Sequence, residues 1–123
     1  MKEKNKDLLR IAEQYQINVW FDLETEEKNM GSSAGNEIWL GVFDDKELLT
    51  IAFFHELAHC LYAKVLPHNE YCSSILAQEG FCWEYGFELA AQHGYQWGIQ
   101  HKVYQYAKKN LLSYVKEETY DRF

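Results

Sequence analysis

Hydrophobic and polar positions alternate along the chain in two different periods, which separates expected helices from expected strands. Residues 4–15 carry apolar side chains at helical spacing, whereas 17–23 alternate in the manner of a strand. Residues 37–43 indicate a second strand. The intervening Gly- and Ser-rich segment, 30–36, is expected to be a loop or a hairpin connection.

The second half of the chain predicts three helices. Residues 48–65 lack Gly and Pro, and Asp44 and Asp45 supply an N-cap aspartate in front of them. Residues 73–93 form the next helical segment, which Gly94 ends, and a last helix is expected to end near Glu117. The pattern therefore predicts an α+β domain with an N-terminal helix, a short sheet of two to three strands and a C-terminal helix.

Composition limits the class of protein. The chain of 123 residues, with 47% hydrophobic content, is expected to be one domain spanning 1–123. No run of eighteen apolar residues is present and the N-terminus is charged, so the sequence predicts a cytoplasmic protein without a membrane span. Cys60, Cys72 and Cys82 lack a C-x-x-C spacing and are expected to be free thiols.

The helix over 48–65 contains the sequence H-E-x-x-H, formed by His55, Glu56 and His59. Two histidines four residues apart project from one face of a helix, where both imidazoles can bind one Zn²⁺ ion. Glu56 is then placed to act as general base toward a water molecule that the zinc activates. The alternative is a pair of core histidines whose hydrogen bonds are satisfied within the protein, but the apolar surroundings make such a charged cluster costly without a metal.

A catalytic zinc site needs a third protein ligand, and the helix over 73–93 offers three carboxylates. At about 100° per residue, Glu79 falls in the middle of an apolar arc that includes Ile75, Leu76, Cys82, Trp83, Gly86, Leu89 and Ala90. Glu84 and Glu88 fall toward the opposite, solvated side. Helical phase therefore favours Glu79 as the ligand, with Glu84 as the alternative.

These residues resemble a known family. The five residues from His55 to His59, followed twenty residues later by Glu79 in Glu-Gly-Phe-Cys-Trp, are similar to the gluzincin metallopeptidases. Residues 8–94 resemble most closely the small ImmA/IrrE-type metallopeptidase domains. The resemblance implies His55, His59 and Glu79 as zinc ligands and Glu56 as the catalytic base. Trp83 departs from it, because many such domains carry Asn at that position.

The expected function is that of a zinc-dependent metallopeptidase with a narrow regulatory protein substrate. The alternative is a non-catalytic zinc-binding module, regulatory or protein-interacting, of phage or mobile-element type. A formal net charge of -7 disfavours nucleic acid and favours a protein or peptide substrate with a basic segment. Residues 38–40 are either the strand edge that pairs with this substrate or an ordinary sheet strand.

Oxyanion stabilisation requires a hydrogen-bond donor outside the ligand set. Four side chains of suitable chemistry lie in the second half of the chain, and the sequence does not select among them: Tyr62, His93, Tyr95 and His101.

Overall fold

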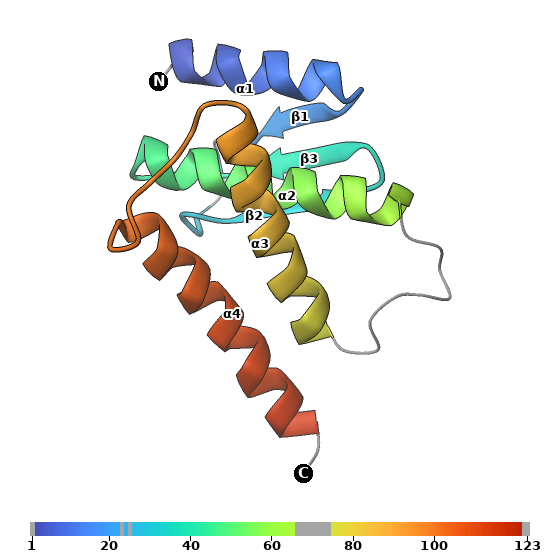
Figure 1. The fold of residues 1–123 in the computed structure, drawn as a ribbon, viewed down its shortest axis with the longest axis vertical. Coiled ribbons are helices and arrows are strands. Elements are labelled where there is room, and N and C mark those ends of the chain that lie inside the picture. The colour runs from blue at the N-terminus through green and yellow to red at the C-terminus, as the bar shows by residue number, and fades with distance from the viewer. Residues whose placement is uncertain (1, 23, 25, 66–74, 122–123) are drawn as a thin grey trace.

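The computed structural model describes residues 2–22, 24, 26–65 and 75–121, and has the α+β layout expected from the sequence (Figure 1). The four helices and the sheet follow one another in the predicted order. The elements are α1 (Lys2–Gln14), β1 (Asn18–Phe21), β2 (Gly31–Ala34), β3 (Glu37–Leu40), α2 (Lys46–Val65), α3 (Ile75–Gln92) and α4 (Lys102–Asp121).

The sheet has three strands in the order β1-β3-β2. β3 pairs in parallel with β1 and antiparallel with β2, so that Trp39 lies beside both Trp20 and Ser32. One expectation was wrong, because residues 30–36 contain the strand β2 instead of being only a connection. Of the two alternatives for residues 38–40, the ordinary sheet strand is confirmed, because they lie in the central strand β3 and not at the edge of the sheet.

Burial explains this strand order. Ile38 and Leu40 are completely buried, so the most buried strand occupies the centre, where both of its backbone edges are paired. β2 consists of Gly-Ser-Ser-Ala and has little intrinsic preference for a strand. It is held by its pairing with β3, and it forms the edge strand that faces the helices.

α2 forms the centre of the domain, with the sheet on one side and α3 crossing it on the other (Figure 1). Phe53, Phe54 and Leu57 of α2 are fully buried, as the nearly all-apolar sequence of this helix predicts. Asp45 caps its first turn by accepting hydrogen bonds from the backbone N–H of Glu47 (2.7 Å) and of Leu48 (3.4 Å). The expected N-cap aspartate is therefore Asp45.

The C-terminal part of the chain is attached to the beginning of α2. The indole Nε1 of Trp97 donates to Glu47 Oε2 at 2.6 Å, and Lys102 pairs with Asp45. These contacts set the direction in which α4 leaves the domain. α4 extends to Asp121 instead of ending near Glu117, whereas Cys72 and the predicted start of α3 at Ser73 lie outside the described residues.

A single glycine allows α3 to approach α2 closely. A Cβ atom at Gly86 would lie 3.1 Å from the Cα of His55 and 3.2 Å from the carbonyl oxygen of Phe54, both of which are backbone atoms. These distances are shorter than most Cβ contacts, so a side chain here would push the two helix backbones apart by a few tenths of an ångström. The crossing lies directly at His55, so it also determines how deeply the side chains of α3 reach toward α2.

We expect Gly86→Ala to lower the free energy of unfolding by roughly 1–3 kcal/mol, because two helix backbones would have to move apart. Gly80→Ala is the matched control on the same helix, since nothing lies within 4 Å of its Cβ position. That variant should be more stable than wild type by about 0.5–1 kcal/mol through helix propensity. Denaturant unfolding of both variants measures the contrast. Equal stabilities would show that the close crossing is not needed.

Candidate metal centre

Three side chains from two helices converge between α2 and α3. Nε2 of His55 lies 3.2 Å from Nε2 of His59, and the carboxylate of Glu79 approaches them to 3.0 and 3.1 Å, respectively. All three side chains are largely buried, at 8%, 21% and 12% exposure in the same order. Within the described part of the chain, this is the one group of His, Cys, Asp and Glu side chains close enough to hold a metal ion.

The spacing of the three groups fits a small divalent cation. Ligands at about 2.0–2.1 Å from a tetrahedral Zn²⁺ ion lie about 3.3 Å from one another, which is close to the distances between these atoms. Oε2 of Glu79 is buried and has no hydrogen-bond partner, although Nε2 of His55 is only 3.0 Å away. The two groups are therefore close without being aimed at each other, as expected for lone pairs directed at a common third atom.

The choice among the carboxylates of α3 agrees with the helical phase. Glu79 faces α2, whereas Glu84 and Glu88 are exposed on the other side of the helix. Five members of the predicted apolar arc are buried, but Ile75 at the helix start is 60% exposed and does not belong to the core. Ile75 is exposed because the first turn of α3 extends beyond the region that α2 covers.

The charges of the centre are coupled. Burial by itself would raise the pKa of Glu79, but the adjacent His55 and His59 outweigh it and the pKa is lowered. Burial would likewise lower the pKa of His59, but the adjacent Cys82 and Glu79 outweigh it and the pKa is raised. Cys82 is fully buried on α3 and does not belong to the metal-binding group. The sequence predicts it as a free thiol on the apolar arc, and its position three residues after Glu79 places both on one helix face.

The raised pKa of His59 predicts how zinc binding depends on pH. Near neutral pH, His59 should carry a proton in the metal-free protein, and this proton must leave before Nε2 can bind a metal. We expect release of about one proton per zinc bound, and a zinc affinity that rises about tenfold per pH unit through neutrality. A histidine with the ordinary pKa of about 6.5 would show this rise only at lower pH. Calorimetric titrations in buffers of different ionisation enthalpy count the protons, and identical heats would contradict the expectation.

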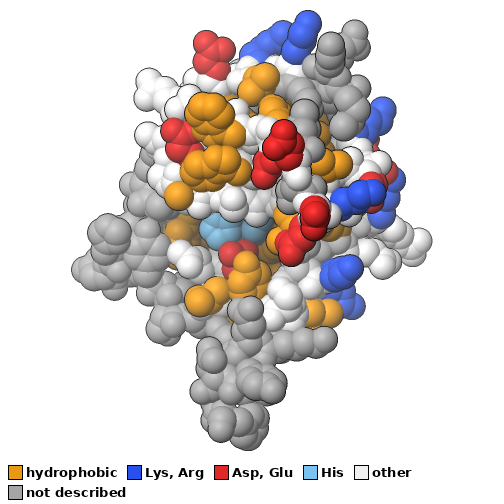
Figure 2. Space-filling view, turned by 180° about the vertical axis from the view of Figure 1, so that it is seen from behind, with side chains coloured by type: hydrophobic (Ala, Val, Ile, Leu, Met, Phe, Trp, Pro, Cys, Tyr) orange, Lys and Arg blue, Asp and Glu red, His pale blue; other side chains and the backbone are white. Residues whose placement is uncertain are grey.

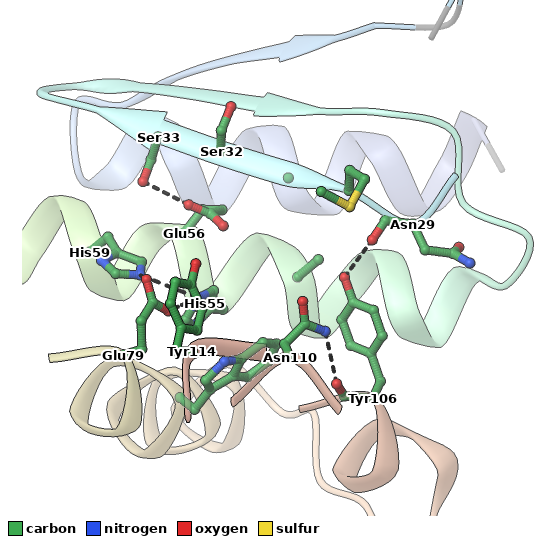
Figure 3. Close-up of a pocket in the computed structure, with 14 residues that line it drawn as sticks. Asn29, Ser32, Ser33, His55, Glu56, His59, Glu79, Tyr106, Asn110 and Tyr114 are labelled. Carbon is green, nitrogen blue, oxygen red and sulfur yellow. Dashed lines mark hydrogen bonds and ion pairs between the residues drawn. The ribbon is translucent and has the colours of Figure 1, made fainter. Parts of the chain in front are cut away.

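Glu56 lies beside the metal centre without belonging to it. Its side chain is buried, with the residue 8% exposed, and its Oε1 accepts a hydrogen bond of 2.7 Å from Oγ of Ser33. Figure 3 shows this carboxylate between β2 and the histidine pair. Edge strand β2 therefore orients the one acidic side chain that the motif places next to the candidate ligands.

A cavity of about 270 Å³ connects these groups. Its walls come from β2 and the residues before it, from α2 and α3, and from Tyr106, Asn110 and Tyr114 of α4 (Figure 3). Viewed from outside, histidine and acidic side chains lie in a hollow with hydrophobic side chains above and below it (Figure 2). The centre is thus buried but open to one face of the molecule.

None of the four side chains considered as oxyanion donors lines this cavity: Tyr62, His93, Tyr95 and His101. His93, for example, is hydrogen-bonded to Tyr15 and stacked on Phe54. Tyr106 and Tyr114 of α4 line the cavity instead. Tyr106, Asn110 and Tyr114 follow one another at intervals of four residues, so they lie on one face of the helix. This spacing is visible in the sequence and could have indicated that the three side chains line one surface.

Tyr106 is held in place at the cavity wall. Its hydroxyl donates a hydrogen bond of 2.8 Å to the carbonyl oxygen of Asn29, which precedes β2. Burial and the nearby charge of Glu56 raise the pKa of Tyr106 to about 12, so this phenol stays protonated at neutral pH. α4 is therefore anchored to the strand side of the cavity as well as to α3.

Trp83 provides the floor beneath His55. The two rings stack with centroids 3.9 Å apart and an interplanar angle of 13°. Trp83 is 4% exposed, so it excludes water from this side of the imidazole. Trp83 therefore has a structural role at the site, because its ring fixes the plane of a candidate ligand.

The comparisons with known proteins do not extend this picture. No family model, curated protein or solved structure matches the chain. Among the described helices, none is both long and apolar enough to cross a membrane. The functional interpretation therefore depends on the residues of the site.

Proposed function

We propose that this protein is a zinc-dependent metallopeptidase in which His55, His59 and Glu79 bind the metal and Glu56 is the general base. The observation that carries the proposal is the position of Glu56, which lies in the cavity of the candidate ligands but outside the ligand group. A purely structural zinc site has no use for a second carboxylate held beside the three ligands.

A bound zinc ion would lower the pKa of its water toward about 7 and polarise a peptide carbonyl. The protein supplies the remaining functions. Glu56 accepts the proton of the attacking water and passes it to the leaving amine, and the hydrogen bond from Ser33 holds its carboxylate in one orientation. Trp83 and the other cavity walls keep competing water away from the histidines.

The arrangement of the sheet suits an extended peptide. β2 is paired only with β3 among the described strands, and its residues Gly31, Ser32 and Ser33 line the cavity. A substrate that adds to this edge as a further strand would run past Glu56 with its backbone fixed by hydrogen bonds. A formal net charge of -7 favours substrates with a basic segment. The resemblance to gluzincins and to ImmA/IrrE-type domains leads to the same proposal.

Zinc-dependent cleavage of a peptide library tests the proposal. Full-length protein is loaded with zinc and incubated with a proteome-derived peptide mixture, and new N-termini are identified by mass spectrometry. We expect cleavage that disappears when a chelator strips the metal and returns when zinc is restored. Unfolded peptides are suitable because an extended segment suffices to pair with β2. No new termini, or termini that persist without metal, would refute the assignment as a peptidase.

A further inference from the structure

A second hollow lies on the outer face of the sheet, next to the metal-binding cavity. It has a volume of about 200 Å³ and is lined by residues of β2, β3 and the segments beside them: Asp22, Met30, Gly31, Ser32, Trp39, Leu40 and Gly41. Trp39 and Met30 are 39% and 50% exposed, which is high for large hydrophobic side chains. We call this hollow the outer pocket.

The outer pocket and the metal-binding cavity share a wall. Met30, Gly31 and Ser32 line both of them. Ser33 points into the cavity toward Glu56, whereas Ser32 points away from it to the other side of the strand (Figure 3). The edge strand β2 therefore separates two hollows, one on each face of the sheet.

A peptide strand added to β2 would place side chains in both hollows. Successive side chains of a strand point to opposite faces, so a residue beside the catalytic cavity is followed by one on the outer face. There it would lie next to Ser32, whose small side chain leaves the Trp39 ring within reach from the adjacent strand.

The lining of the outer pocket has the chemistry of a site for a basic side chain. The indole of Trp39 and the thioether of Met30 can pack against an aliphatic stem, and the carboxylate of Asp22 can pair with a cationic head. Asp22 accepts one hydrogen bond, from the backbone N–H of Glu24, and its side chain is exposed. Nearby, Glu24 and Glu26 are exposed acidic residues.

Lys28, a basic residue close in sequence to these acidic residues, does not pair with Asp22, Glu24 or Glu26. Lys28 pairs with Asp44 at 3.3 Å, on the loop that leads into α2. Figure 2 shows acidic side chains beside hydrophobic ones above the hollow that contains the histidines, with Lys and Arg side chains toward the edge of this face. Local charge therefore favours a cation over a neutral or acidic side chain.

We infer that the outer pocket is a specificity subsite that binds an arginine or lysine side chain of a peptide paired with β2. The inference rests on the proposed peptidase function for the position of the peptide. It adds the substrate class: a peptide in which a basic residue directly precedes or follows the residue whose side chain faces the metal-binding cavity.

Binding of designed peptides tests the subsite without requiring hydrolysis. Short fluorescein-labelled host peptides of Thr, Ala and Gly carry a single Arg at each position in turn, and a parallel set carries citrulline, its neutral isostere. Fluorescence anisotropy measures their binding to zinc-loaded Glu56→Gln protein. We expect Arg to bind roughly three- to thirtyfold more tightly than citrulline, at alternate positions of the peptide.

Two variants with matched controls locate the preference. Asp22→Asn should reduce the Arg-to-citrulline ratio to near one, whereas Glu84→Gln, which removes the same charge from the exposed side of α3, should preserve it. Trp39→Leu should weaken binding of the Arg peptides, whereas Trp20→Leu should not. Trp20 is 55% exposed on the adjacent strand but does not line the outer pocket.

The outcomes separate this inference from the proposed function. Equal binding of Arg and citrulline peptides, no measurable binding, or a preference that survives Asp22→Asn would each overturn the subsite. Cleavage of peptides without a basic preference would also overturn it while leaving the peptidase proposal intact. An Arg preference that depends on Asp22, with no hydrolysis by wild-type protein, would support the subsite and count against the peptidase.

Discussion

Glu56→Gln should lower the rate of peptide hydrolysis by about 10²–10⁴-fold, which is the usual contribution of a positioned general base. The amide retains the shape of the side chain and can still interact with Oγ of Ser33, but it cannot accept the proton of the attacking water. Zinc content should stay at the wild-type level because Glu56 lies outside the ligand group. Hydrolysis of a fluorogenic peptide found by library screening, together with elemental analysis of the metal, measures both quantities.

Ser33→Ala is the matched control for this experiment. It removes only the hydrogen bond of 2.7 Å that orients Glu56, so the rate should fall far less than with Glu56→Gln. Wild-type rates in the Glu56→Gln variant would show that this carboxylate is not the base. Loss of zinc from that variant would instead place Glu56 among the ligands.

Glu79→Ala should weaken zinc binding by more than the roughly 10–100-fold that the loss of an outer-shell partner costs, because it deletes a direct ligand. It would also leave His55 and His59 without the buried carboxylate that lies 3.0 and 3.1 Å from their Nε2 atoms. Competitive titration with a chromogenic chelator measures the affinity. The remaining two imidazoles are too few for a stable protein zinc site.

Glu84→Ala and Glu88→Ala provide the comparison on the same helix. Both side chains are exposed on the side of α3 that faces away from α2, so their zinc affinities should equal that of wild type. A larger loss in the Glu84 variant than in the Glu79 variant would reverse the assignment of the third ligand. It would also invalidate the argument from helical phase.

Much of the candidate site could be predicted because it depends on local periodicity. His55 and His59 lie one turn apart on any α-helix, and the uninterrupted apolar sequence of α2 made that helix plain. Glu79 was found in the same way, since the phase of a helix determines which carboxylate faces the core. These inferences required only the geometry of single helices.

The side chains that surround the candidate ligands were harder to predict. Cys82 raises the pKa of His59, and Trp83 stacks on His55. Both were expected on the apolar side of α3, but the sequence does not contain the depth at which α3 crosses α2. The distance between the two helices at their crossing depends on Gly86, because the backbone of His55 lies where a side chain would otherwise be. The sequence alone does not show which residue packs against this glycine.

The sequence by itself thus determined the helices and the α+β order. It also determined which side of each helix carries the two histidines and Glu79, since the phase of a helix depends only on residues within a few turns of one another. Tertiary structure alone decided the rest of the cavity. β2 became a strand because Gly-Ser-Ser-Ala pairs with the buried β3, which overrides its weak local preference. Tyr106 and Tyr114 reached the cavity because α4 is anchored through Lys102 and Trp97 to the start of α2, contacts between residues about fifty positions apart that no local pattern encodes.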